Sequence, residues 1–357
     1  MGVDYHLIDI GQLLSADGSE ALAVNNAGVV VGSCQPAPGA VAGFRYQFRG
    51  GVLELPDPFP PPRFFAMGIN DATPEMIVGV TAGLNGENEP ALWTNGEFSS
   101  LRAIVGNGEA RDINDSGIVV GTKIGTTNSP TSTTAFVLDT NTGQMTTDLL
   151  LPNGTWSVGR AVNDQGWAVG YAEYPVPAGS HHAVRYANGV LTDLDPNGLL
   201  SIAHDIDHLG FAAGVARIAE MDQAVLFLPR GGIRPLSLLP GVTGSVAYGV
   251  TSTAQRTEPP YFPHVVGQMT MPSGDGQADL RAFLWFFDRL LNQEVCVDLS
   301  QAGVPPTGAA SDYFFHTAWA VDDEATRIIG TATYTDPTTG STSERAVMLT
   351  DPRVWPP

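Results

Sequence analysis

The stretch Ala110–Gly121, ARDINDSGIVVG, decides the fold, because related copies of it recur along nearly the whole chain. Each copy contains a step from Val or Ile to a polar residue, and successive steps lie 45, 44, 49, 44, 44 and 71 residues apart. A period of about 40 to 50 residues is typical of the four-stranded blades of a β-propeller. The seven steps are Val24-Asn25, Ile69-Asn70, Ile113-Asn114, Val162-Asn163, Ile206-Asp207, Val250-Thr251 and Val321-Asp322.

Each repeat predicts two β-hairpins. In the copy Ala161–Tyr171, AVNDQGWAVGY, two apolar segments flank Asn-Asp-Gln-Gly. Asn, Asp and Gly reverse the chain readily because they tolerate a left-handed backbone. About ten residues later, a second hairpin runs from Ala183 through Asn188-Gly189 to Asp193-Leu194. No segment has helical periodicity, so we predict an all-β, seven-bladed β-propeller with four antiparallel strands per blade.

The seventh repeat has no room for a fourth strand, because only residues 351–357 follow its third. The segment Leu7-Ile8-Asp9-Ile10 has the same apolar-Asp-apolar ending as Leu191–Leu194. We therefore predict that the N-terminal strand joins the last blade and closes the ring, which removes an exposed sheet edge. The chain is then one propeller domain, residues 1–357, with blades at about 21–56, 66–102, 110–151, 159–195, 203–239, 247–299, and 318–351 plus 3–11.

The composition is strongly acidic, with 17 basic and 37 acidic residues and a formal net charge of −20. Nucleic acid and anionic membranes are bound by clustered Lys and Arg, so we expect neither as a partner. The N-terminus lacks the basic and apolar segments of a signal peptide. Cys34 and Cys296 fall in the first and sixth blades, which predicts free thiols. We expect a cytoplasmic monomer; the alternative is a secreted protein whose signal peptide has been removed.

The repeats resemble those of the HAF-repeat family, in which a His-Ala-Phe tripeptide follows an I-N-x-x-G-x-x-V-G hairpin. The nearest copies of the tripeptide are His182-Ala183-Val184, Thr134-Ala135-Phe136 and Arg281-Ala282-Phe283. The resemblance covers essentially the whole chain and implies the propeller architecture. It implies no particular activity, and many similar proteins look extracellular.

One position of the repeat varies in chemistry while its neighbours stay small or apolar. It follows the Ala or Gly that opens the first strand, and in an innermost strand it lines the central channel. Polar groups on one side and apolar groups on the other can orient a small molecule. The alternative is that arginines at this position pair with Glu109, Asp112 or Asp205 and that aromatic residues plug the channel. Read around the ring, the position holds Leu22, Met67, Arg111, Arg160, His204, Tyr248 and Trp319.

Two long loops enter innermost strands and are expected to overhang the same channel. They carry Phe59, Phe65, Phe315 and His316. As a lid these side chains exclude water; alternatively they pack the loops down. His182 begins a third strand near the same rim, and we expect it to contact the ligand. A metal site and acid–base chemistry are alternative roles for it. Adjacent strand residues point to opposite faces, which argues against a joint site with His181.

These residues suggest a cofactor-independent enzyme, without metal, of lyase, cyclase or hydrolase type, acting on a small anionic or aromatic molecule in the channel. His204 is the candidate general base or acid and Tyr248 a proton donor. Arg111 and Arg160 bind a carboxylate or stabilise a developing anion. The alternative is a propeller that binds a small molecule, glycan or protein without catalysis. The candidate substrate-binding residues are Trp319, Met67, Leu22, Glu109, Asp205, Phe65, Phe315, His316 and His182.

Overall fold

The computed structural model describes residues 5–14, 18–37, 39–48, 50–55, 63–83, 86–125, 132–174, 179–252, 263–273, 278–288, 291–300, 302 and 312–351. The candidate lid residue Phe59 lies outside these residues. The described chain forms seven four-stranded antiparallel sheets, the blades of an all-β, seven-bladed β-propeller. It divides into two compact units, residues 1–54 with 236–357 (unit 1) and residues 55–235 (unit 2).

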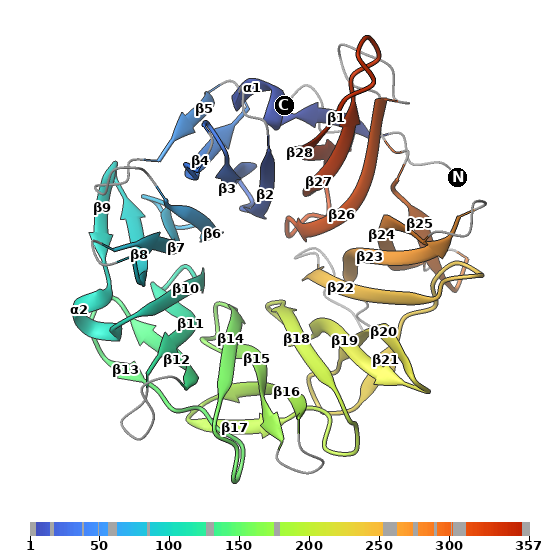
Figure 1. Ribbon diagram of the computed structural model, residues 1–357. Coiled ribbons are helices and arrows are strands. Elements are labelled where there is room, and N and C mark those ends of the chain that lie inside the picture. Colours follow the sequence, from blue (N-terminus) through green and yellow to red (C-terminus); the bar gives the residue numbers. More distant parts are fainter. Residues whose placement is uncertain are drawn as a thin grey trace. The chain divides into compact units, whose positions relative to one another are not determined.

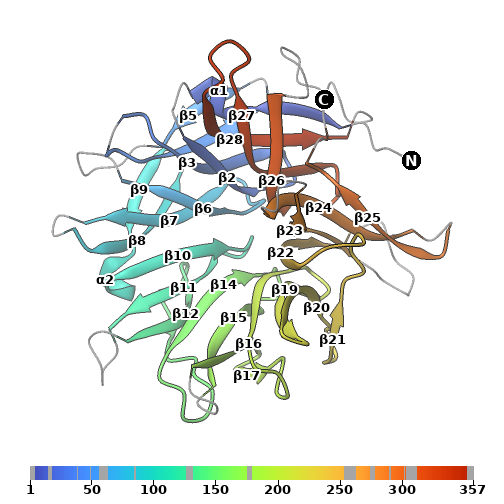
Figure 2. The ribbon, with the colours of Figure 1, turned by 45° about the vertical axis from the view of Figure 1, so that its right-hand side comes forward.

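Unit 2 contains blades 2 to 5, and in each sheet the strand order follows the chain. Figures 1 and 2 show the first strands of these blades side by side, as their contacts also indicate. The strands are β6 (Phe65–Ile69), β7 (Met76–Ala82), β8 (Asn88–Thr94), β9 (Glu97–Ser100), β10 (Gly108–Ile113), β11 (Ile118–Ile124), β12 (Thr133–Asp139), β13 (Met145–Thr146), β14 (Ser157–Val162), β15 (Ala168–Tyr174), β16 (Ser180–Ala187), β17 (Val190–Asp193), β18 (Ser201–Ile206), β19 (Ala212–Ile218), β20 (Met221–Phe227) and β21 (Ile233–Pro235), with helix α2 (Arg102–Val105) after blade 2.

Unit 1 contains blades 1, 6 and 7. Its elements are β1 (His6–Asp9), α1 (Ile10–Leu14), β2 (Ser19–Val24), β3 (Val29–Cys34), β4 (Ala42–Gln47), β5 (Gly51–Glu54), β22 (Gly244–Thr251), β23 (His264–Pro272), β24 (Ala278–Asp288), β25 (Gln293–Asp298), β26 (Tyr313–Val321), β27 (Arg327–Thr335) and β28 (Thr342–Thr350). In the described chain both helices are single short turns, and neither has the length to cross a membrane.

The first and second strands of a blade approach each other closely at the glycine that ends the repeat motif. In blade 3 this residue is Gly121, opposite Ala110. A Cβ atom at Gly121 would overlap the carbonyl oxygen of Glu109 and would lie 2.9 Å from the ring of Phe136, which packs beneath it. The glycine is therefore required by packing at this point rather than by turn geometry.

Blade 7 takes its fourth strand from the N-terminus. β1 pairs antiparallel with β28, from His6 opposite Thr350 to Asp9 opposite Val347. The strand is shorter than the predicted residues 3–11, because α1 begins at Ile10 and residues 3 and 4 lie outside the described chain. The N-terminal segment thus occupies the place that the fourth strand has in the other blades.

Side-chain pairs support this equivalence. In blade 7, Asp9 of β1 accepts hydrogen bonds from the Tyr313 hydroxyl at 2.8 Å and from Arg345 Nη1 at 3.2 Å. In two other blades, the first residue of the tripeptide makes the same contact from the third strand to an Asp of the fourth strand. These contacts are His182 to Asp193 in blade 4, at 2.8 Å, and Arg281 to Asp298 in blade 6, at 3.0 Å.

Asp9→Ala should lower the free energy of unfolding by about 3 kcal/mol, because it leaves Arg345 and Tyr313 without their shared buried acceptor. Asp222→Ala provides a matched control, since Asp222 forms an exposed pair with Arg217 and its loss should cost less than about 1 kcal/mol. Urea unfolding of both variants measures the difference. Equal losses would show that Asp9 does not hold β1 in blade 7.

Candidate functional site

The variable position of the repeat is a β-bulge in every blade. The pairing of the first and second strands shifts by one residue there, and the extra residue has no partner opposite it. A bulge re-aims its side chain and bends the strand, and bulges are frequent next to functional sites. The bulged residues are Leu22, Met67, Arg111, Arg160, His204, Tyr248 and Trp319.

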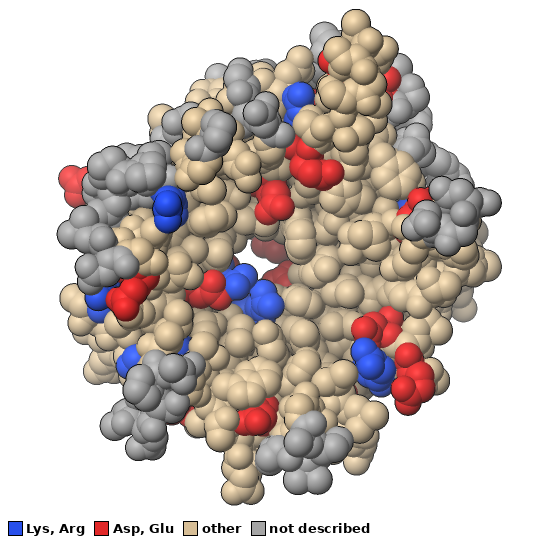
Figure 3. All heavy atoms as spheres, in the orientation of Figure 1, with Lys and Arg blue, Asp and Glu red and all other residues tan. Residues whose placement is uncertain are grey.

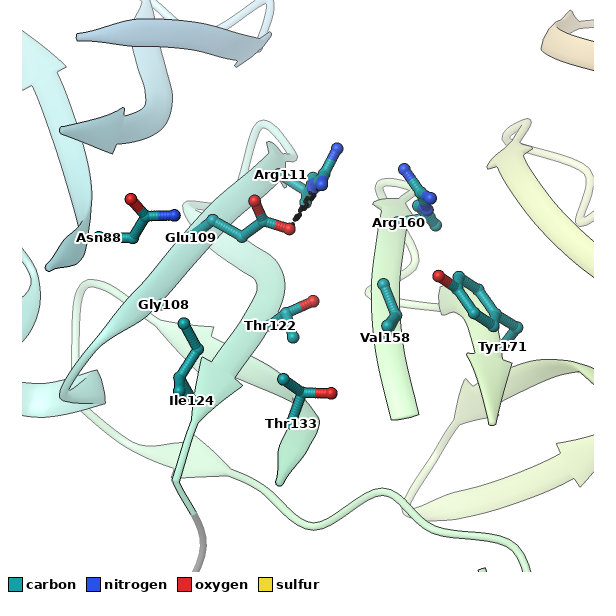
Figure 4. Close-up of a pocket in the computed structure, with 10 residues that line it drawn as sticks. All are labelled: Asn88, Gly108, Glu109, Arg111, Thr122, Ile124, Thr133, Val158, Arg160 and Tyr171. Carbon is teal, nitrogen blue, oxygen red and sulfur yellow. Dashed lines mark hydrogen bonds and ion pairs between the residues drawn. The ribbon is translucent and has the colours of Figure 1, made fainter. Parts of the chain in front are cut away.

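A groove of about 250 Å³ lies within unit 2 between blades 3 and 4 (Figure 4). We call it the blade 3–4 groove. Three repeat positions contribute to it from both blades: the residue before the opening Ala or Gly, the bulged residue, and the residue after the closing Gly. The lining residues are Asn88, Gly108, Glu109, Arg111, Thr122, Ile124, Thr133, Val158, Arg160 and Tyr171.

The two guanidinium groups of the groove differ in their partners. Arg111 Nε donates to Glu109 Oε1 at 2.6 Å, so this arginine adopts the ion pair that the alternative interpretation predicted. Arg160 forms no ion pair in the described chain and lies over the ring of Tyr171, with Cζ 5.6 Å from the ring centroid. Figure 4 shows both guanidinium groups at the same rim of the groove. The lining therefore carries two positive charges and one negative charge.

Two buried polar atoms of the groove residues lack hydrogen-bond partners in the part of the chain that the structure describes. They are the Thr122 hydroxyl oxygen and Arg160 Nε. Such groups cost about 1 to 3 kcal/mol each when buried without a partner, and native proteins satisfy most of them with water or a ligand. Both atoms can donate a hydrogen bond, so an oxygen-rich ligand would suit them.

The next bulge along unit 2 places His204 close to both arginines. Burial, followed by the positive charges of Arg160 and Arg111, lowers the pKa of His204 to about 3. The expectation that His204 exchanges protons near neutral pH is therefore wrong. Its imidazole is neutral at physiological pH.

Asp112 follows the bulge of β10 and connects two blades. Its Oδ2 accepts the backbone N–H of Val162 in β14 at 2.8 Å, and its Oδ1 accepts that of Ile113. Burial raises the pKa of Asp112 to about 7, and the charges of Asp205 and Asp164 act in the same direction. Asp112, which the sequence suggested only as a possible partner of the arginines, thus titrates near neutral pH. Asp205 occupies the equivalent position in β18, where its Oδ1 accepts the N–H of Ile206.

The remaining candidates of unit 2 lie outside the groove. Met67 and Phe65 are partly buried residues of β6 and do not line it. His182 is fully buried: its Nδ1 contacts Asp193 and its ring stacks on Tyr174 at 4.1 Å. The prediction that His182 contacts a ligand is therefore wrong, because its side chain joins two strands of blade 4.

Unit 1 holds the other candidates. Tyr248 and Trp319 are adjacent, with ring centroids 4.5 Å apart, and the Trp319 indole donates to the Thr331 hydroxyl. The prediction for Phe315 as a ligand contact is wrong, because this side chain is 1% exposed in the core of blade 7. His316 Nε2 lies 2.6 Å from Glu344 Oε2, and Leu22 is partly buried in β2. That Tyr248, Trp319 and Leu22 share a cavity with the arginines stays a prediction.

Sequence reasoning missed the groove residues outside the first strands. Thr122 and Tyr171 directly follow the closing glycines Gly121 and Gly170, and they are equivalent positions of blades 3 and 4. This position also varies between repeats, which was the available signal. Asn88, Ile124 and Thr133 come from strand ends that carry no repeat signature.

The surface is sparsely charged on the face shown in Figure 3. Lys and Arg occur there in small groups, most of them beside Asp or Glu. Among the described residues, no three His, Cys, Asp or Glu side chains are placed to hold a metal ion.

Comparison with known proteins places the chain among propellers and assigns no activity. The sequence model of a family described as "Protein of unknown function (DUF3466)" matches residues 94–195, a segment that contains all groove residues except Asn88. No curated protein matches the sequence significantly.

Solved structures share the fold at low sequence identity. Puromycin hydrolase matches with a TM-score of 0.54 and 14% identity over 95% of this chain and 55% of that chain. The β-propeller domain of the Trilobed protease from Pyrococcus furiosus matches with a TM-score of 0.53 and 11% identity over 94% of both chains. The chain spans about half the length of puromycin hydrolase. These likenesses concern the fold alone.

The free energy of unfolding of the Asp112→Asn variant should rise, relative to that of the unsubstituted protein, by about 2 kcal/mol when the pH is raised from 5 to 8. The raised pKa means that folded Asp112 keeps a proton that the unfolded chain has lost. This contribution to stability is complete below about pH 4 and is lost as the pH rises to about 7. Urea unfolding at the two pH values measures the change.

Asp139→Asn is the control for this titration. Hydrogen bonds from Thr142 and Asn141 lower the pKa of Asp139, so this carboxyl is ionised in the folded and unfolded states throughout the range. Its substitution should have the same effect at both pH values. A flat response of Asp112→Asn as well would contradict the raised pKa.

Proposed function

We propose that the protein binds a small organic anion in the blade 3–4 groove. The supporting observation is the excess of positive charge there: two arginines and one glutamate line a groove in a chain that has 17 basic and 37 acidic residues. Guanidinium groups bind carboxylates and phosphates through charge-assisted hydrogen bonds. The volume of about 250 Å³ lies below the range of about 300 to 1,000 Å³ for drug-sized ligands, which favours a single small molecule.

Arg160 is the proposed anchor for the anion. Arg111 already has Glu109 as a partner, whereas Arg160 forms no ion pair in the described chain. His204 lies near both arginines without lining the groove, and its neutral imidazole adds no charge there. A ligand carboxylate would therefore give Arg160 an ion-pair partner that the described chain does not supply.

Arg160→Ala should weaken binding of acetate and benzoate at least ten-fold, measured by isothermal titration calorimetry at low ionic strength, because it removes the anchoring charge. Arg185→Ala is the matched control: Arg185 also lies in blade 4 and over an aromatic ring, Trp167 at 5.4 Å, and it does not line the groove. Its affinities should not change. Equal losses in both variants, or no carboxylate binding by the unsubstituted protein, would overturn the proposal.

We propose as a second function that the bound anion is converted by a cofactor-independent enzyme of lyase, cyclase or hydrolase type. The observation that favours it is the row of bulges that sets a neutral imidazole beside two guanidinium groups, since a neutral imidazole can donate a hydrogen bond to a developing negative charge.

The lyase form of this second function requires that a base take a proton from the carbon beside the ligand carboxylate, and Glu109 is the carboxylate of the groove lining that could receive it. In D₂O, NMR should detect deuterium at that carbon in D-lactate incubated with the protein. His204→Ala should abolish the exchange while acetate still binds. Absence of exchange with the unsubstituted protein, with acetate bound, would reduce the function to binding.

We also propose that β1 closes the ring of blades. The support is the pairing of β1 with β28 and the buried Asp9 contacts with Tyr313 and Arg345. The propeller domain of the Trilobed protease is described as having an open velcro topology, so a similar fold does not by itself require closure.

A further inference from the structure

We infer that the anion bound in the blade 3–4 groove is a carboxylated sugar, a hexuronate unit. This inference rests on the proposed anion binding and names the class of the ligand. The groove offers more hydrogen-bonding side chains than a simple carboxylate can use. A sugar acid combines one carboxylate with several hydroxyl groups on a ring that also has apolar C–H faces.

The number of polar side chains in the lining carries the argument. Besides the arginines, five side chains with hydrogen-bonding groups line the groove, and only Ile124 and Val158 are aliphatic. An aromatic or alicyclic acid would displace water from these polar groups without replacing its hydrogen bonds, which lowers affinity. Hydroxyl groups of a sugar can replace them. The five residues are Asn88, Glu109, Thr122, Thr133 and Tyr171.

The polar groups of the lining are placed where they can contact the hydroxyl groups of a sugar whose carboxylate is bound by Arg160. In Figure 4 the hydroxyl groups of Thr122 and Thr133 face the side of the groove on which Tyr171 lies, and the Asn88 amide lies near Glu109. The Thr122 hydroxyl has no hydrogen-bond partner in the described chain. A carboxylate at Arg160 would therefore leave the hydroxyl groups of the same sugar ring within a lining of donors and acceptors.

An aromatic cluster supports one wall of the groove. The ring of Tyr171 contacts those of Trp156 and His181, at 5.7 and 5.2 Å between centroids, and these two lie 5.9 Å apart. All three residues are partly exposed. Mutual ring contacts hold the Tyr171 side chain in place, and aromatic rings offer an apolar surface with polar atoms at the edge. The C–H face of a pyranose ring fits such a surface.

The test compares ligands that differ in one property at a time. Calorimetry would measure D-glucuronate, D-galacturonate, D-mannuronate and L-guluronate against two matched sets. The neutral hexoses keep the hydroxyl groups and lack the carboxylate, and cyclohexanecarboxylate keeps the ring and the carboxylate and lacks the hydroxyl groups. The tightest hexuronate should bind at least ten-fold more tightly than its neutral hexose and than cyclohexanecarboxylate.

Variants locate the hydroxyl recognition. Thr122→Val and Thr133→Val keep the side-chain shape and should each weaken hexuronate binding several-fold, without changing cyclohexanecarboxylate binding. Thr134→Val is the control, because Thr134 is buried, also has no hydrogen-bond partner for its hydroxyl in the described chain, and does not line the groove. It should leave both affinities unchanged.

The outcomes separate this inference from the proposed function. If cyclohexanecarboxylate or benzoate binds as tightly as every hexuronate, the sugar assignment is overturned and anion binding stands. If neutral hexoses bind as tightly as hexuronates, the carboxylate has no role, and both proposals fail. If no carboxylate binds, both proposals also fail.

Discussion

The interaction on which the blades of unit 2 depend is a ladder of buried asparagine side chains at the hairpin turns. In Asn114, Oδ1 accepts the N–H of Ile118 within its own turn, and Nδ2 donates to the carbonyl oxygen of Asn163 in the next blade. Asn70 and Asn163 make the same two contacts, the latter ending on Asp207. One side chain thus satisfies its own turn and sets the position of the neighbouring blade. Loss of either partner would leave a buried polar group unsatisfied.

The ladder explains why the bulged residues are free to vary. In blades 2 to 4 an asparagine anchors the end of the first strand, and the closing glycine lets the second strand approach, so the backbone between them is held by its neighbours. The bulged residue is extra to the strand pairing, so the pairing itself does not restrict its side chain. Where its successor is small, the next blade approaches closely: a Cβ at Gly68 would lie 2.8 Å from Cα of Asp112. Asp112 itself uses its carboxylate to bond Val162 of the following blade.

The sequence was sufficient to predict the blades, because turn chemistry and the repeat period are local properties that recur seven times. It also marked the variable position, although a bulge depends on pairing between strands and could not be recognised there. The groove could not be predicted from the sequence, since Tyr171 and Thr122 lie on second strands and meet the arginines only after the sheets pack. The protonation state of His204 was beyond sequence reasoning, because burial and two nearby guanidinium groups decide it. His182 and Phe315 were wrongly predicted to contact a ligand, because neither the tripeptide motif nor the position at the end of a loop reveals that a side chain is buried.

Repeated blades can still build one distinct site, because the side chains at equivalent positions differ from blade to blade. Blade 3 supplies Glu109, Arg111 and Thr122, and blade 4 supplies Val158, Arg160 and Tyr171 from the same three positions. In blade 5 these positions hold Ile202, His204 and Val215, two aliphatic residues and a neutral imidazole. The junction of blades 3 and 4 therefore collects two guanidinium groups, whereas the junction of blades 4 and 5 has only one. In a chain with a net charge of −20, this local excess of positive charge is the reason why we propose the first junction, rather than the repeat as such, as the place where an anion binds.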